Sequence, residues 1–204
     1  LSGPSLTRSG DVASILTTIS DGDILFIDEV HRLPRVCEEI LYSAMEDFAL
    51  DILIGKGPGA RSVRINLPSF TLIGATTRIS LLSAPLRNRF GIIEKLDFYN
   101  QNDLSAIVLR SAVVMNVPID QDASSEIARR SRGTPRIANR ILKRVRDFAQ
   151  FYGRSAINKE IVKEALECLE IDDMGLNSMD RNLLKILLEH YHGGPVGINN
   201  LAMM

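Results

Sequence analysis

Two adjacent carboxylates, Asp28 and Glu29, directly follow a short apolar run over residues 24–27. Four apolar residues in a row predict a strand buried on both faces, as central strands of a parallel sheet are. Ligands of open α/β sheets bind at the carboxyl ends of the strands. At such an end Asp28 is suited to hold a hydrated Mg²⁺, and Glu29 to orient or deprotonate a water that attacks a phosphate. A buried strand that runs into a solvated acidic turn is the alternative.

A second apolar run, residues 70–75, also stops at polar side chains. It predicts a second buried strand, and the residues that follow it include Thr76 and Thr77. Their hydroxyl groups are able to hold a phosphate oxygen or a water.

Two arginines that flank one residue, Arg87 and Arg89, stand shortly after this strand and just before Phe90 and Gly91. A planar guanidinium binds phosphate through two hydrogen bonds and keeps its charge at every physiological pH. The pair therefore predicts a compact cationic tip that meets phosphate. A pair of ordinary surface arginines is the alternative.

Between the two predicted strands, residues 51–67 alternate apolar and polar side chains around a turn cluster at residues 55–59. This pattern predicts a β-hairpin inserted between a helix and the next strand. Its apolar residues could belong to the main core. A hairpin buries little by itself, however, so an exposed Val63 and Ile65 would form a patch for a binding partner.

Helical periodicity predicts the elements that position these motifs. A domain boundary is expected near residues 97–101, because strand signals become rare beyond it. Two helices are predicted in the first part of the chain, one opening at Gly10-Asp11 and one after Pro34. Five more are predicted beyond the boundary: 104–115, a helix capped by Asp122 that ends near Gly133, 135–148, 161–169 and 176–188. Residues 172–175 are predicted to be a linker.

The region from Arg129 to Arg154 holds nine Arg or Lys residues and one acid, Asp147. Most of these side chains are expected to form a solvated helix face, although a locally basic patch can meet phosphates. Arg136 differs from the rest because it follows Pro135 in the first turn of its helix. There the helix dipole and the guanidinium both favour an anion.

The composition is that of an ordinary globular protein: 204 residues, 45% hydrophobic, 24% charged, with a formal net charge of −1. Cys37 and Cys168 lie far apart without metal-ligand spacing, which argues against a disulfide framework or a zinc site and fits a reducing cytosol. No apolar stretch approaches about 18 residues, so no membrane segment is expected. Because the chain starts with Leu1, we expect it to be a piece of a longer protein.

The chain resembles the RuvB family of bacterial AAA+ ATPases over essentially its whole length. The resemblance rests on the order of four features: the motif at residues 26–33, the hairpin, Gly74-Ala75-Thr76-Thr77-Arg78 and the arginine tip. The resemblance implies an α/β class fold. It consists of a P-loop AAA+ core, a parallel sheet with an inserted β-hairpin, followed by an all-helical lid domain and the start of a winged-helix domain. We expect these domains over residues 1–99, 100–172 and 173–204.

The resemblance also implies roles toward ATP and Mg²⁺. Asp28 and Glu29 match the Walker B pair, and Thr77 matches sensor 1 beside the γ-phosphate. Arg89 matches the arginine finger, which acts on the nucleotide of the neighbouring subunit, while the role of Arg87 stays open. Arg136, in Gly-Thr-Pro-Arg, matches sensor 2.

By the same resemblance, the hairpin with Val63 and Ile65 docks on RuvA. The protein is then expected to be a cytoplasmic ATP hydrolase and DNA helicase of recombination, repair and the SOS response, without contact to a membrane. It would work on Holliday-junction and duplex DNA as a homo-oligomeric ring, a hexamer, with RuvC as an indirect partner.

One departure from the family pattern is the absence of G-x-x-x-x-G-K-[ST] from the sequence. The expected winged helix also stops before its recognition helix. We therefore expect this chain by itself to bind ATP weakly or not at all. The alternatives are another AAA+ protein, such as a clamp-loader subunit, and a non-catalytic module that docks DNA or a partner. The hairpin and the Gly-Thr-Pro-Arg motif favour the motor over the clamp loader.

Overall fold

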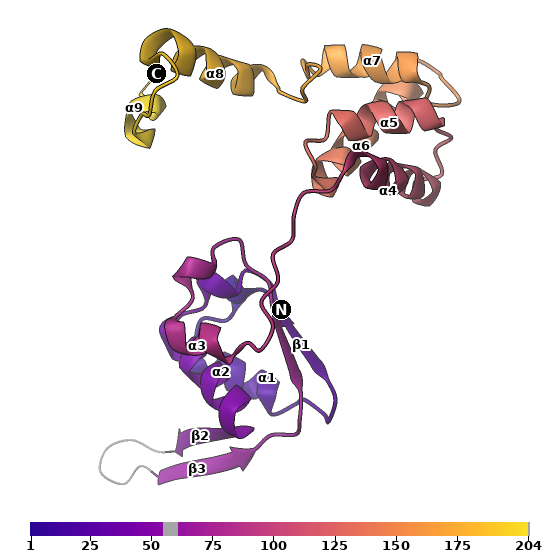
Figure 1. The fold of residues 1–204 in the computed structure, drawn as a ribbon. Coiled ribbons are helices and arrows are strands. Elements are labelled where there is room, and N and C mark those ends of the chain that lie inside the picture. Colours follow the sequence, from indigo (N-terminus) through magenta and orange to yellow (C-terminus); the bar gives the residue numbers. More distant parts are fainter. Residues whose placement is uncertain (55–60, 204) are drawn as a thin grey trace. The chain divides into compact units, whose positions relative to one another are not determined.

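The computed structural model describes residues 1–54 and 61–203 (Figure 1). The chain divides into two compact units, Leu1–Glu94 and Lys95–Met204, and each unit has a hydrophobic core of its own. The turn predicted at residues 55–59 lies outside the described residues.

The first unit contains the predicted pair of parallel strands, β1 (Ile24–Ile27) and β4 (Thr71–Gly74). The pairing is in register, with Ile27 opposite Gly74 at the carboxyl ends. Residues that follow the two strands therefore emerge at the same edge of the sheet.

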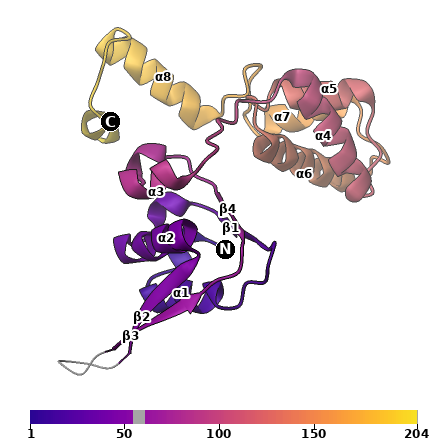
Figure 2. The ribbon, with the colours of Figure 1, turned by 60° about the horizontal axis from the view of Figure 1, so that its bottom comes forward.

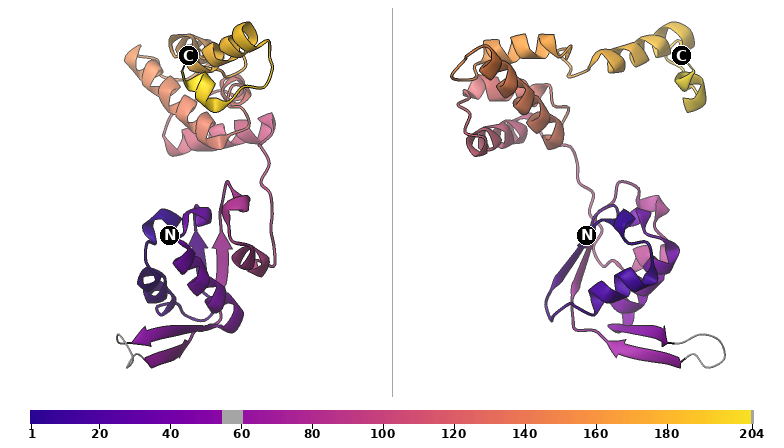
Figure 3. Two further views of the ribbon diagram at one scale, coloured as in Figure 1. Left: turned by 90° about the vertical axis from the view of Figure 1, so that its left-hand side faces the viewer. Right: turned by 180° about the vertical axis from the view of Figure 1, so that it is seen from behind.

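Helices α1 (Ser9–Leu16) and α2 (Arg35–Asp47) share one hydrophobic core with alternate residues of β1, and the views of Figure 3 show them on one side of the strands. The other face of β1 is open, because Ile24 and Phe26 are 66% and 47% exposed. The expectation that this strand is buried on both faces is wrong, and so is the expectation of a buried second strand, because Ile73 of β4 is 44% exposed. Side chains of a strand alternate between its two faces, and the described residues cover only one of them.

The inserted hairpin is confirmed as β2 (Ala49–Ile54) paired antiparallel with β3 (Arg61–Asn66). Figure 2 shows it as a ribbon distinct from the β1–β4 pair. Phe48 ends α2 in a left-handed conformation, with φ 47°, and this reverses the chain into β2. The short elements that complete the unit are η1 (Gly3–Ser5), η2 (Val30–Arg32), η4 (Ile79–Leu81) and α3 (Ala84–Arg89).

The second unit is helical, as predicted, with α4 (Gln101–Val114), α5 (Gln121–Arg129), α6 (Pro135–Phe151) and α7 (Lys159–Cys168) packed around one core. The largest fully buried side chains of that core are Leu104, Ile127, Leu142, Ile157 and Leu166.

The prediction that Asp122 caps α5 is wrong, because the cap lies two residues earlier in the chain. Asp120, not Asp122, has the extended backbone of a cap residue, and its Oδ1 accepts a hydrogen bond from the Ala123 amide at 2.6 Å. Asp122 already lies inside the first turn. An acidic residue is favourable at both positions, so the sequence pattern alone does not separate them.

The chain continues into α8 (Ser178–Tyr191) and α9 (Ile198–Ala202). Asn177 and Asp180 form a capping box at the start of α8. The predicted linker before it is held in a turn, because Asp172 Oδ1 accepts hydrogen bonds from the amides of Met174 and Leu176, both at 2.9 Å. Among the described residues, no helix combines the length and hydropathy needed to cross a bilayer.

A pair of glycines tests the packing at the end of β1. A Cβ on Gly3 would lie 2.4 Å from the Glu29 carbonyl oxygen, whereas a Cβ on Gly10, in α1, would meet nothing within 4 Å. We predict that Gly3→Ala lowers the free energy of unfolding of the first unit by about 1–3 kcal/mol. Gly10→Ala should leave it unchanged or raise it by up to about 1 kcal/mol. Urea unfolding of both variants measures the difference, and equal midpoints would contradict the packing.

Candidate functional site

The predicted acidic pair lies where β1 ends. Asp28 is exposed, and its Oδ1 accepts a hydrogen bond from the Glu29 amide at 2.9 Å. Glu29 has the left-handed conformation, with φ 50° and ψ 42°, which is uncommon for a residue with a side chain. Backbone conformations of this kind cluster at functional sites, where the surrounding structure holds them.

The carboxylate of Glu29 has one ion-pair partner among the described residues, Arg32, whose Nη1 lies 3.2 Å from Oε2. Both side chains are about half exposed, at 45% and 58%. An exposed pair of this kind contributes little free energy, so the carboxylate can exchange Arg32 for water at small cost.

The hydroxyl segment after β4 lies beside this acidic turn. The Ala75 amide donates to the Ile27 carbonyl at 2.9 Å, and the Val30 amide donates to the Ala75 carbonyl at 3.0 Å. One residue later, Thr76 Oγ1 and His31 Nδ1 are 2.8 Å apart and share a hydrogen bond. Thr77 follows and is exposed. The structure thus brings the segments of Asp28, Glu29 and Thr77 to one edge of the sheet.

Residues 1–3 position this turn through backbone hydrogen bonds. The Gly3 amide donates to the Asp28 carbonyl at 2.7 Å, and the Asp28 amide donates to the Leu1 carbonyl at 2.9 Å. These bonds pair Ser2 with Asp28 as a parallel bridge. The sequence carries no signal for this pairing, because the contacts join residues 25 to 27 positions apart in the chain. The same is true of the bond between Thr76 and His31.

The predicted arginine tip is not free in the structure. Arg89 ends α3, which Leu86 anchors in the core, and its guanidinium lies against α2. Arg89 Nη2 donates to the Tyr42 hydroxyl at 3.1 Å, and Nη1 forms an ion pair with Glu46 Oε2. The Arg89 side chain is still 36% exposed. Arg87 is half-buried.

The two apolar hairpin residues differ in exposure. Val63 is 41% exposed, and Ile65 is half-buried opposite the buried Leu50. Between them, Arg64 forms ion pairs with Asp47 at 3.1 Å and Asp51 at 3.6 Å. The hairpin therefore enters the core at its base, while its apolar face is open at Val63.

In the second unit, Arg136 is exposed in the first turn of α6, directly after Pro135, as predicted. The side chain of Thr134 leaves the first amides of this helix uncapped. Pro135 has no N–H, and the amides of Ile137 and Ala138 donate to the Thr134 carbonyl, both at 3.1 Å. The group that this turn offers an anion is therefore the Arg136 guanidinium, which the positive end of the helix dipole supports.

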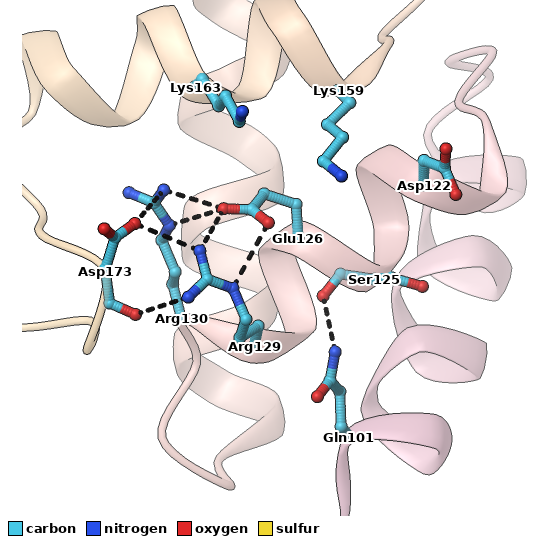
Figure 4. Close-up of a pocket in the computed structure, with 9 residues that line it drawn as sticks. All are labelled: Gln101, Asp122, Ser125, Glu126, Arg129, Arg130, Lys159, Lys163 and Asp173. Atoms are coloured by element: carbon cyan, nitrogen blue, oxygen red, sulfur yellow. Dashed lines mark hydrogen bonds and ion pairs between the residues drawn. The ribbon is translucent and has the colours of Figure 1, made fainter.

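Two arginines of the basic region have a structural role instead. Figure 4 shows Glu126, which is only 7% exposed, between the guanidinium groups of Arg129 and Arg130. Arg130 Nη2 lies 2.8 Å from Glu126 Oε1 and 2.8 Å from Asp173 Oδ1. Burial by itself raises the pKa of Glu126, but hydrogen bonds from the two arginines outweigh it and lower that pKa. Arg130 is buried and does not belong to the expected solvated helix face, whereas the Arg129 side chain is 41% exposed, as expected.

Three family models match the chain in succession. They are described as the Holliday junction DNA helicase RuvB P-loop domain, over residues 1–96, the RuvB AAA lid domain, over 99–172, and the RuvB C-terminal winged helix domain, over 173–204. Together they match nearly all of the chain.

Curated relatives give the same result. The chain is 58% identical over 202 residues to the Holliday junction branch migration complex subunit RuvB of Lawsonia intracellularis, and 57% identical to that of Oleidesulfovibrio alaskensis. These alignments cover 99% of this chain and 59% and 63% of the two relatives. The chain therefore spans about three-fifths of their length.

The comparison with solved structures agrees with the family models and with the curated relatives. The structure of the Thermotoga maritima RuvB Holliday junction branch migration motor superposes with a TM-score of 0.84 and 51% identity, covering all of this chain and 63% of that one. A variant of the same protein superposes with a TM-score of 0.86. The expected architecture, an α/β AAA+ domain followed by a lid and the start of a winged helix, is thereby confirmed. The chain belongs to the RuvB family.

Proposed function

We propose that this chain is part of an ATP-driven DNA motor subunit that drives branch migration of Holliday junctions together with RuvA. The observation that carries the proposal is the meeting of Asp28 and Glu29 with the Thr76-Thr77 segment at one sheet edge. It occurs in a chain 58% identical to a subunit named for the branch migration complex. We also propose the domain bounds: residues 1–99 for the AAA+ domain, 100–172 for the lid and 173–204 for the start of the winged helix.

Asp28 is the residue that would hold Mg²⁺. Its carboxylate is exposed, and its one hydrogen bond in the described residues comes from the next amide in the chain. Mg²⁺ commonly binds one or two carboxylates together with waters and substrate phosphates, so a single open carboxylate fits it. The ion, when bound with ATP, neutralises charge on the phosphates.

Glu29 then acts on water. Its carboxylate lies one residue beyond Asp28, so it accepts a proton from, or orients, a water that attacks the γ-phosphate. Thr77, at the end of the neighbouring strand, donates its hydroxyl to a phosphate oxygen. Arg136 in the lid contributes a cation that responds to the nucleotide.

Arg89 supplies positive charge to the nucleotide of the next subunit. This role in trans requires a ring, which we propose to be a hexamer in the cytoplasm that encircles duplex DNA. RuvA binds the apolar side of the hairpin, at the exposed Val63 and the half-buried Ile65. RuvC takes part indirectly, through the same junction.

The first test is Glu29→Gln in the intact parent protein. Loss of the carboxylate should lower DNA-stimulated ATP turnover by about 10²–10⁴-fold, while ATP binding is retained. Turnover with and without duplex DNA measures the effect, and nucleotide binding is the control. If the wild-type parent binds DNA but does not hydrolyse ATP, the protein is a docking module and the motor proposal fails.

A second test concerns the hairpin. Val63→Asp combined with Ile65→Asp places charge on the apolar face, which should abolish RuvA binding and leave basal ATP hydrolysis intact. A pull-down with RuvA and a turnover assay separate the two properties. Equal loss of both would place these residues in the folding core instead.

A third test concerns the trans action of Arg89. Arg89→Ala subunits alone should lose about 10³–10⁵-fold in turnover, the usual contribution of an arginine finger. Mixing them with Glu29→Gln subunits should restore activity, because each mixed interface can join an intact catalytic site to an intact arginine. Mixed rings without recovered turnover would argue against action across the interface.

A further inference from the structure

The guanidinium of Arg89 is held by three contacts to α2. Nη2 donates a hydrogen bond to the Tyr42 hydroxyl at 3.1 Å, and Nη1 is paired with Glu46 Oε2. The guanidinium carbon also lies 5.0 Å from the centre of the Tyr42 ring, a cation–π distance. Two side chains of one helix thus fix both the position and the plane of the charged group.

Both helices that meet at this contact are anchored. Tyr42 and Glu46 are four residues apart on α2 and therefore share one face. The opposite contacts of α2 lie in the core, where Cys37 and Leu41 are fully buried, and Leu86 of α3 is fully buried in the same cluster. The contact is therefore built on rigid elements rather than on a loop.

We propose that Tyr42 and Glu46 are positioning residues for Arg89, which hold its guanidinium ready to meet a phosphate of the neighbouring subunit. The inference rests on the proposed trans role of Arg89. A free arginine side chain loses rotamer entropy when it is ordered, and here that loss is already incurred on folding. The guanidinium has five N–H donors, and the contacts to α2 leave several of them for a phosphate.

The contact with Arg89 is partly exposed, which favours a role of Tyr42 and Glu46 in positioning its guanidinium over a role in blocking it. The side chains of Arg89 and Glu46 are 36% and 38% exposed, so water screens their attraction. A phosphate oxygen can therefore replace or join Glu46 without leaving a buried charge unpaired. Glu126 and Arg130 are buried, so neither could exchange its partner without leaving a buried charge unpaired.

Two conservative variants test the proposal in the full-length protein. Tyr42→Phe keeps the ring and removes the hydroxyl, and Glu46→Gln keeps the shape and removes the charge. Each should lower kcat for DNA-stimulated ATP hydrolysis by about threefold to tenfold with KM unchanged, because the lost bond orders a group that acts in the transition state. Glu39→Gln is the matched control, since Glu39 is exposed on the same face of α2 two turns earlier.

Mixed rings separate positioning from a general effect on folding. In rings of Arg89→Ala and Glu29→Gln subunits, turnover depends on the arginine that the Glu29→Gln subunit donates. Tyr42→Phe added to that subunit should lower the recovered turnover. The same substitution added to the Arg89→Ala subunit should leave it unchanged. A structural defect would act in both subunits alike.

Several outcomes overturn the inference. Wild-type kcat in both variants, a higher kcat, or an equal effect in either subunit of the mixed ring would each exclude positioning. Absent turnover in the wild-type protein, or full turnover of Arg89→Ala, would instead refute the proposed function and remove the basis of the inference with it.

Discussion

The parallel, in-register pairing of β1 with β4 is the constraint on which the candidate site depends. Because Ile27 lies opposite Gly74, the residues that follow the two strands must emerge together. The hydrogen bonds from Val30 to Ala75 and between His31 and Thr76 extend that contact past the strands. A shift of either strand by one residue would separate the carboxylates from the hydroxyls.

Arginine serves two different purposes in this chain, and burial distinguishes them. Arg130 is almost fully buried between Glu126 and Asp173, so losing a partner would leave an uncompensated charge. Arg89 is paired at a half-exposed surface, where partners exchange at low cost. The second environment is the one that suits the proposed role of Arg89 toward a nucleotide, because its partners can be replaced at low cost. The two arginines look alike in the sequence, and only their surroundings separate them.

Much of the fold was predictable because its signals are local. The apolar runs at 24–27 and 70–75, the alternation of the hairpin and the helical periodicity beyond residue 100 all correspond to observed elements. The errors have physical causes. Four apolar residues in a row do not reveal that Ile24 and Phe26 lie on an uncovered face. Two acids two residues apart do not reveal that Asp120, rather than Asp122, caps α5.

The sequence by itself determined the identity and order of the candidate site residues: the acidic pair, the threonines, the arginine tip and the Gly-Thr-Pro-Arg turn. It did so because these motifs are contiguous, and their chemistry follows from residue type. Only the tertiary structure decided the support of these groups. Gly3 against Glu29, Thr76 on His31, and Tyr42 with Glu46 on Arg89 are contacts between segments 26 to 47 residues apart. Packing creates such contacts, and no local pattern encodes them.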